Sequence, residues 1–445
     1  YDATYSSAKE ALASGAPKKT WVIKTNHEGK ATLDENSLVS GDTLYRDRDG
    51  NVVLPIGSVV IEETKAPQGY KLPTDSQPIL RTISDTTSFS DTVLVYNPPT
   101  IADDVIRGGI RITKFDAESH EQAALGGASL DGTTFEIALA SDVPVYVDGI
   151  KYRCGDVVKT LVITDGVAQT DPDCLPYATY TITETTPGEG YLLTDGTPRT
   201  FSITEPGVLV EPFATQNTFD NQVKRGDLEL IKVGEGTMER LAYVPFRLTS
   251  KTTGENHIVV TDENGKLSTH ASWNPHSYNT NANDAAEADS YDADAGVWFG
   301  VTQSGEPTPP NDKLGALPYD TYQLTELACS ANAGYQLVDI DNITVRKDSQ
   351  TIDLGTVVDS VTRTPEIATF ASDGSDDDKY ISPTTDAVIL DEVAYENLEA
   401  GKTYLLKASL HVVETDEEGN AATRPVTDAN DTPVTTSHVF MAHST

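Results

Sequence analysis

The chain has little positive charge and almost no cysteine. Its 445 residues hold 32 Lys and Arg against 69 Asp and Glu, a formal net charge of -37 at pH 7. Such a charge repels nucleic acids and anionic membrane surfaces, so neither is expected as a partner. Three cysteines cannot form a disulfide framework. Nothing in the sequence supports a bridge between Cys154 and Cys174, and their redox state stays open.

Several signals are missing as well. No apolar run is long enough to span a bilayer, so no membrane insertion is expected in this fragment. The chain starts at Tyr1 without a signal peptide, and we expect a piece of a larger protein whose secretion and anchoring signals lie outside it. Neither a two-histidine zinc-protease motif, a Gly-x-Ser-x-Gly motif nor a phosphate loop occurs. We therefore expect no turnover enzyme and no cofactor.

Patterns of helical period are almost absent too. Short runs rich in Val, Ile, Thr and Tyr alternate with turns of Gly, Pro, Asn and Asp, which is typical of an all-β chain. The exception is residues 5–14, where Ala and Glu predict a short helical turn.

One motif recurs three times. It reads YTITETTPGEGY at 180–191 and VVIEETKAPQGY at 59–70, and a looser copy spans 322–335. Strand alternation puts two apolar side chains and then a glutamate on one face, so that a carboxylate points at the core. One such glutamate is usually a strand end emerging into water, but three in one frame, each followed by Gly-Tyr, indicate a repeated device. The three glutamates are Glu63, Glu184 and Glu326.

Other polar side chains point inward on the first and last strands of the expected units. Lys114 and Lys232 each continue a face that begins with two apolar residues. On the last strands the inward polar residues are Asn97, Asn221 and Asp359. They follow the motif glutamates by 34, 37 and 33 positions, a spacing that is hard to obtain by chance.

These residue types can react with one another. Burial of a lone lysine is costly unless it is paired or loses its proton, and burial raises the pKa of a nearby glutamate. A neutral amine is a nucleophile, and a protonated carboxyl can polarise an Asn or Asp carbonyl and move protons. Held together they can condense into an amide, with loss of ammonia from Asn or water from Asp. The alternative is a buried Lys-Glu salt bridge, and the residues alone leave both interpretations equally open.

The pattern resembles the SpaA/Cna-B type domains of Gram-positive pilins and surface adhesins. The resemblance implies a string of immunoglobulin-like or prealbumin-like β-sandwich domains with internal isopeptide bonds. In the second copy it implies a bond from Lys114 to Asn221 with Glu184 as the catalytic acid.

The other two copies depart from the family pattern. In the third, the resemblance implies a bond from Lys232 to Asp359 through Glu326, with Ala-Cys-Ser-Ala-Asn in place of the Pro turn. In the first, Glu63 and Asn97 fit the pattern. Its lysine strand is expected before Tyr1, because Lys24 sits in a later strand.

The last 80 or so residues resemble the opening of a VaFE-type repeat, a surface-protein domain with an internal Thr-Gln ester bond. Thr369 would supply the ester oxygen and Asp391 would assist. The glutamine acceptor is expected after Thr445. The expected domains are therefore 1–106 (lacking its first strand), 107–224, 225–362 (with an insert at about 270–312) and 363–445.

The insert is the longest irregular stretch. Its part at 270–298 is the best place to look for a ligand, because long loops are either functional or merely mobile. His270 and His276 have no third partner nearby, and the acidic turns at 47–51 and 373–378 lack a full calcium loop. We therefore expect no metal site.

Together these features predict an extracellular, cell-wall-associated stalk or pilin-like protein that supports adhesion and whose only chemistry is cross-linking itself. One alternative is an adhesin whose insert at 270–298 binds a host or matrix protein or a glycan. The other is an accessory β-sandwich region of a secreted glycan-active enzyme. Sortase and other pilin subunits are expected partners, through regions outside this fragment.

Overall fold

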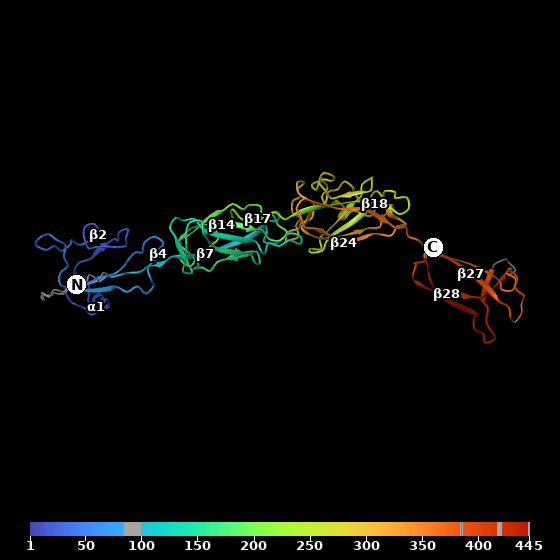
Figure 1. Cartoon of the computed structure of the whole chain (residues 1–445), viewed down its shortest axis with the longest axis horizontal. Coiled ribbons are helices and arrows are strands. Elements are labelled where there is room, and N and C mark those ends of the chain that lie inside the picture. The colour runs from blue at the N-terminus through green and yellow to red at the C-terminus, as the bar shows by residue number, and fades with distance from the viewer. Residues whose placement is uncertain (84–98, 383, 385, 416–420, 444–445) are drawn as a thin grey trace.

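The computed structural model describes residues 1–83, 99–382, 384, 386–415 and 421–443. Figure 1 shows four parts that follow one another along one long axis, from blue at the N-terminus to red in the last part. Nearly all regular structure is β-strand, which confirms the all-β prediction. Helix α1 (Ala8–Ala13) falls where a helical turn is predicted, and the Ser7 side chain caps it. No described helix has the length and apolar character needed to span a membrane.

Residues 107–224 form two sheets that enclose one apolar core. One sheet has the order β11 (Val157–Val162), β8 (Thr134–Leu139), β14 (Ala178–Thr186) and β15 (Arg199–Ile203). The other is built on β7 (Arg107–Asp116), which pairs with β12 (Val167–Gln169), β13 (Leu175–Pro176), β16 (Leu209–Val210) and β17 (Phe219–Asn221). A small hairpin of β9 (Val145–Val147) and β10 (Ile150–Tyr152) belongs to neither sheet but packs Val145 and Val147 into the core.

Residues 225–362 repeat this plan. One sheet has the order β20 (Asn256–Val260), β19 (Pro245–Ser250), β23 (Asp320–Glu326) and β24 (Asp339–Val345). The other is built on β18 (Arg225–Gly234), which pairs with β21 (Lys266–Ser268), β22 (Leu317–Pro318) and β25 (Gln350–Asp359). Two short 3-10 turns, η1 (Ala282–Ala285) and η2 (Ser330–Asn332), lie in the connections.

The first and last strands of both parts run parallel and share one register. On β7 and β17, Phe219 lies opposite Lys114, and Asn221 comes two positions later. On β18 and β25, Val357 lies opposite Lys232, and Asp359 comes two positions later. Because strand side chains alternate with period two, each lysine and its acceptor point to the same side of the sheet.

In the outer parts, the described residues form only two-stranded sheets. In residues 1–106 the pairs are β1 (Trp21–Ile23) with β2 (Leu38–Gly41), β3 (Gly57–Ile61) with β5 (Ile79–Ile83), and β4 (Tyr70–Lys71) with β6 (Asp104–Val105). In the last part they are β26 (Glu366–Asp373) with β27 (Ile389–Glu396), β28 (Thr403–Ser409) with β31 (Thr435–Met441), and β29 (His411–Thr415) with β30 (Ala421–Pro425).

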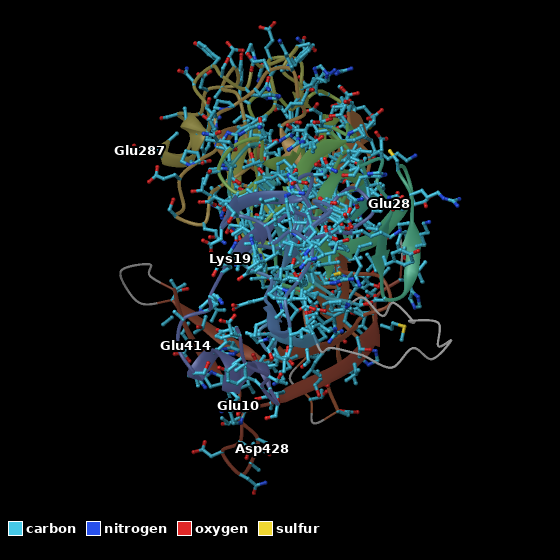
Figure 2. All side chains as sticks on the ribbon, turned by 90° about the vertical axis from the view of Figure 1, so that its left-hand side faces the viewer. Glu10, Lys19, Glu28, Glu287, Glu414 and Asp428 are labelled. Carbon is cyan, nitrogen blue, oxygen red and sulfur yellow. The ribbon has the colours of Figure 1, made fainter. Side chains whose placement is uncertain are left out.

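The excess of negative charge lies on the surface. Figure 2, a view along the long axis, shows acidic side chains at the edge of the molecule, among them Glu10, Glu28, Glu287 and Glu414. All four are exposed. Most buried charged groups among the described residues belong to the sites and the joint described next, whereas Asp227, Asp320 and Asp373 lie elsewhere.

Candidate functional site

The first site, called here the 114 site, consists of Lys114, Glu184 and Asn221. The three residues come from β7, β14 and β17, and all are buried. The Lys114 ammonium lies 3.2 Å from Glu184 Oε2 and donates to the Phe219 carbonyl at 3.0 Å. Asn221 Nδ2 donates to Glu184 Oε1 in a close contact. One carboxylate therefore touches both the amine and the amide.

Burial disfavours the charged forms of Lys114 and Glu184. It lowers the pKa of Lys114, against the attraction of Glu184, which acts in the opposite direction. It also raises the pKa of Glu184, although Lys114 and Asn221 favour the ionised form. A lysine that loses its proton more easily and a glutamate that holds one more strongly favour proton transfer between them.

The second site, called here the 232 site, brings together Lys232, Glu326 and Asp359 from the corresponding strands β18, β23 and β25, and here the lysine contacts both other side chains. All three side chains are fully buried. The Lys232 ammonium lies 3.0 Å from Glu326 Oε2 and makes a closer contact with Asp359 Oδ1. Burial and the neighbouring Glu326 raise the pKa of Asp359 to about 6, despite the opposing effect of Lys232.

Both acceptor side chains carry an oxygen without a partner. Among the described residues, Asn221 Oδ1 and Asp359 Oδ2 are buried and make no hydrogen bond. A buried polar atom without a hydrogen-bond partner lowers the folding stability by about 1–3 kcal/mol, and folded proteins contain few such atoms. Its recurrence on the expected acceptor of both sites sets these two side chains apart from ordinary buried salt-bridge partners.

The other expected site residues are less closely assembled. Glu63 is half-buried just after β3; burial and the carboxylate of Asp103 raise its pKa. Asn97 lies outside the described residues, and Lys24 is exposed after β1. Thr369 and Asp391 are exposed.

Thr369 and Asp391 lie on the paired strands β26 and β27. Thr369 is opposite Val393, and Asp391 is opposite Ala371. The two side chains are therefore diagonal neighbours on one face of the sheet.

Sequence reasoning missed two buried polar residues next to the sites. Asn332, in η2, donates to Glu326 Oε1 at 2.8 Å. Asp116, two residues after Lys114, accepts a hydrogen bond of 2.8 Å from the hydroxyl of Tyr191, the tyrosine of the repeated motif. The inward frame of β7 contains the signal for Asp116, because positions 110, 112, 114 and 116 share one face. Asn332 lies in a turn without strand periodicity, so no comparable signal marks it.

The Gly-Tyr end of the motif forms a joint between successive parts. The Gly190 carbonyl accepts from the Lys224 N–H, and the Lys224 carbonyl accepts from the Tyr319 N–H, both at 2.8 Å. The same two contacts join the first and second parts. The Gly69 carbonyl accepts from the Ile106 N–H, and the Ile106 carbonyl accepts from the Tyr177 N–H.

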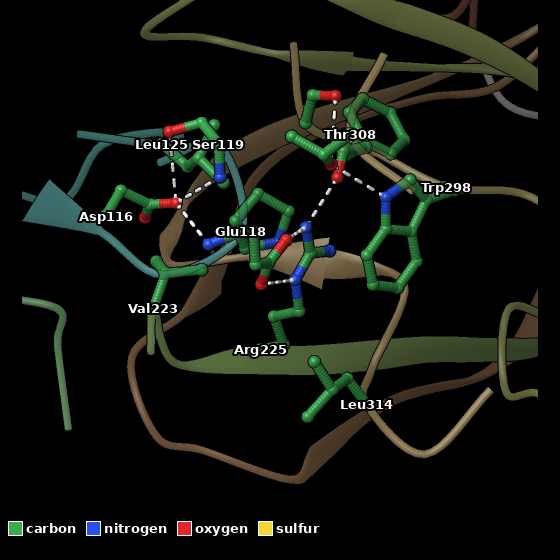
Figure 3. Close-up of polar contacts among 12 residues, drawn as sticks. Asp116, Glu118, Ser119, Leu125, Val223, Arg225, Trp298, Thr308 and Leu314 are labelled. Atoms are coloured by element: carbon green, nitrogen blue, oxygen red, sulfur yellow. Dashed lines mark hydrogen bonds and ion pairs between the residues drawn. The ribbon is translucent and has the colours of Figure 1, made fainter. Parts of the chain in front are cut away.

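A buried ion pair closes the joint between the second and third parts (Figure 3). Arg225 is fully buried, and its Nε and Nη2 donate to the two oxygens of Glu118 at 2.7 and 2.6 Å. Its remaining donors reach the carbonyls of Ala316 and Phe299, and its guanidinium lies 3.7 Å from the Trp298 ring centre. A buried charge with a bidentate partner and satisfied donors fixes the orientation of the groups around it.

The insert supports this joint. Trp298 stacks on Arg225 and donates through Nε1 to Thr308 Oγ1 at 3.0 Å. Asp284 in η1 pairs with His257 at 2.6 Å and accepts the Ile258 N–H at 2.9 Å. These contacts tie the middle and the C-terminal end of the stretch expected to hold a ligand (270–298) to the body of the third part.

The described cysteines and histidines form neither a disulfide nor a metal site. Cys154, Cys174 and Cys329 are free thiols. Within the described ranges, no group of three His, Cys, Asp or Glu side chains is arranged to hold a metal ion. His276 is buried, and its Nε2 lies 3.0 Å from the Leu314 carbonyl.

Two family models match the chain. Residues 108–217 match the SpaA family, a prealbumin-like fold domain, and residues 365–444 match the T-Q ester bond containing domain. The matches cover most of the second part and of the last part, and they confirm the predicted resemblance to these two families.

Solved structures also match the chain, at sequence identities of 13–15%. The TIE protein of Bacillus anthracis is 15% identical over 96% of this chain and 60% of its own length, with a TM-score of 0.37. BcpA, the major pilin subunit of Bacillus cereus, is 13% identical over 78% of this chain and all of its own, with a TM-score of 0.26. A streptococcal ancillary pilin is 15% identical over 80% of this chain and 96% of its own, with a TM-score of 0.21. No curated protein matches the chain.

Substitution of Gly190 tests the joint. An alanine Cβ there would lie 2.7 Å from the Ala128 Cβ and 2.8 Å from the Tyr319 ring. We expect Gly190→Ala to lower the unfolding free energy by about 1–3 kcal/mol more than Gly334→Ala. Gly334 is a matched control, because its φ of +89° is close to the +83° of Gly190 and its Cβ would meet nothing within 4 Å. Equal losses in thermal unfolding of the two variants would contradict a packed joint.

The attachment of the insert should depend on pH. Burial alone would lower the pKa of His257, but Asp284 and Glu255 outweigh it and raise that pKa to about 9. A raised pKa gives stability that is complete below the unfolded value of about 6.5 and is lost as pH rises through about 9. We expect hydrogen exchange at residues 282–286, corrected for the intrinsic rate, to speed up over this range. The His257→Gln variant should lose that dependence, and an unchanged pH profile in it would contradict the assignment.

Proposed function

We propose that the chain is a section of an extracellular, cell-wall-associated stalk of a Gram-positive bacterium, stabilised by bonds that it forms within itself. The supporting observation is the repetition of one constellation. In two parts of the chain, a buried lysine on the first strand lies in register with a buried Asn or Asp on the last strand and contacts a buried glutamate of the facing sheet.

In the 114 site the reaction is a condensation with loss of ammonia. Glu184 accepts a proton from Lys114, and Nζ attacks Cγ of Asn221. The Nζ–Cγ bond forms and the Cγ–Nδ2 bond breaks. Nζ gives up two protons: one leaves with ammonia and the other stays on Glu184. The contact between Glu184 and Asn221 Nδ2 supports this route, because that nitrogen must gain a proton in order to leave.

The 232 site would condense with loss of water, since its acceptor is Asp359. The first part would be a domain of the same type, with Glu63 and Asn97 in the corresponding roles. In the last part, Thr369 would be the ester nucleophile and Asp391 its assistant. The matched T-Q ester bond family and the shared face of β26 and β27 support these two roles.

A stalk function also accounts for the joints. The Gly-Tyr contacts and the buried Arg225–Glu118 pair restrain successive parts in a line, which a passive spacer has no need to do. Both matched families are structural, and self-cross-linking is a single-turnover reaction, so no enzymatic role is proposed. Sortase and other pilin subunits are the partners that such a stalk would meet.

The bond in the 114 site can be tested by intact mass. Glu184→Gln removes the proton carrier and keeps the size of the side chain, so this variant should retain the ammonia that the parent loses. A tryptic map should then recover the Lys114 and Asn221 peptides separately. A mass difference equal to the substitution alone would contradict the assignment of Glu184.

The stalk role can be tested by single-molecule pulling. With the bond in place, force passes from Lys114 to Asn221 and bypasses the 106 residues between them. A loop of that size also removes unfolded-state entropy worth about 4–5 kcal/mol. The parent should show no full extension step for residues 108–224, whereas Glu184→Gln should show one. A full step in the parent would overturn the proposal.

A further inference from the structure

The third part has a buried amide where the second has a Pro-Gly turn. Asn332, at the end of η2, is 2% exposed. Its Nδ2 donates to Glu326 Oε1 and to the Leu327 carbonyl, both at 2.8 Å. Its Oδ1 accepts the Cys329 N–H at 2.8 Å. These three contacts fix the amide orientation, with a donor directed at Glu326.

Three donors converge on Glu326, whereas the Asp359 side chain accepts only from Lys232 among the described residues. Glu326 Oε2 accepts from the Val338 N–H and from Lys232, each at 3.0 Å, while Asn332 occupies Oε1. A carboxylate that accepts three hydrogen bonds favours its ionised form. Asp359 contacts Lys232 through Oδ1, and its Oδ2 has no partner among the described residues.

We propose that Asn332 is a positioning residue that holds Glu326 ionised and thereby leaves the shared proton of the two carboxyl groups on Asp359. The inference rests on the proposed condensation in the 232 site. It explains how the site can use an aspartate: an amine does not displace oxygen from an ionised carboxylate, whereas a neutral carboxyl can release water.

The proton balance agrees with this role. Ionised Glu326 takes a proton from Lys232, Nζ attacks Cγ of Asp359, and the Cγ–O bond of the hydroxyl breaks. Of the two protons that Nζ gives up, one leaves with the hydroxyl as water and one stays on Glu326. The 114 site needs no such device, because Asn221 is neutral at every pH. There the Asn221 amide itself donates to the glutamate, as Asn332 does in the 232 site.

The site has few other titratable neighbours. The charged groups that face Asp359 are Lys232 on β18 and Glu326 on β23. The Cys329 thiol lies at the start of η2, and burial raises its pKa, so it is neutral. The reaction rate should therefore fall as pH rises above about 6, where Asp359 loses its proton.

The experiment follows bond formation in the newly synthesised full chain. Samples from cell-free synthesis are quenched at intervals, from about pH 5 to about pH 8, and the Lys232–Asp359 cross-linked peptide is quantified by mass spectrometry. Asn332→Asp is the main variant, because it keeps an acceptor for the Cys329 N–H but replaces the donor to Glu326 with a negative charge. Asn332→Ala removes the donor without adding charge. The Lys114–Asn221 cross-link in the same molecules serves as the internal control.

We expect Asn332→Asp to slow formation of the Lys232–Asp359 bond about tenfold at neutral pH. The pH at which the rate falls should also rise, because the added carboxylate keeps the proton on the pair to higher pH. Asn332→Ala should also slow bond formation, and the pH at which the rate falls should change less than in Asn332→Asp. Parent-like rates and pH profiles in both variants would overturn the proposal. Slower bond formation in Asn332→Asp without a change in the pH at which the rate falls would also overturn it, since Asn332 would then only build the turn.

Two further outcomes separate this inference from the proposed function. Loss of ammonia in place of water from the third part would make Asn332 the acceptor and overturn its positioning role. Absence of any cross-link at Lys232 in the parent would instead refute the proposed condensation in this site, and the positioning role with it.

Discussion

The structure depends on the burial of a lysine ammonium between the first and last strands of a β-sandwich. Lys114 and Lys232 have no exposed surface. A lone charge in such a place would cost more than the packing around it returns, so the fold must bring a carboxylate and a polar last-strand residue to the same point. The parallel pairing of β7 with β17 and of β18 with β25 brings the last-strand residue beside the lysine, and the facing sheet supplies the glutamate from β14 or β23.

The sequence predicts these groupings because they follow from local alternation along strands. A period of two is enough to put Lys114 in line with Ile110 and Ile112, and the repeat of the motif identifies the glutamate. Asn332 escapes such reasoning, since it reaches Glu326 from a 3-10 turn that takes the place of the Pro turn. Arg225 escapes it as well: in sequence it is a charged linker residue, and only Glu118 and Trp298, more than 70 positions away on either side, make it a buried one.

The long insert illustrates the same limit. Its several Asn residues and its lack of periodicity are compatible with a mobile ligand-binding loop. Folded, it places Trp298 on the guanidinium of Arg225 and Asp284 on the ring of His257. Its length serves contacts between distant segments, and such contacts leave no periodic trace in the sequence. An irregular stretch of sequence is therefore weak evidence for mobility when it contains a tryptophan and several short polar side chains that can cap turns.

The joint and the two sites belong to one mechanical path. If both amide bonds form, force enters the second part at Lys114, crosses to Asn221, and re-enters a covalent bridge at Lys232. Only residues 222–231 then carry the load as ordinary polypeptide between the two bonds. Arg225 lies within this stretch, and its fully satisfied guanidinium anchors the stretch to both neighbouring parts. The joint is thus reinforced by noncovalent contacts at the one place between the two sites where the path has no cross-link. A stalk under tension needs reinforcement at that place more than within its domains.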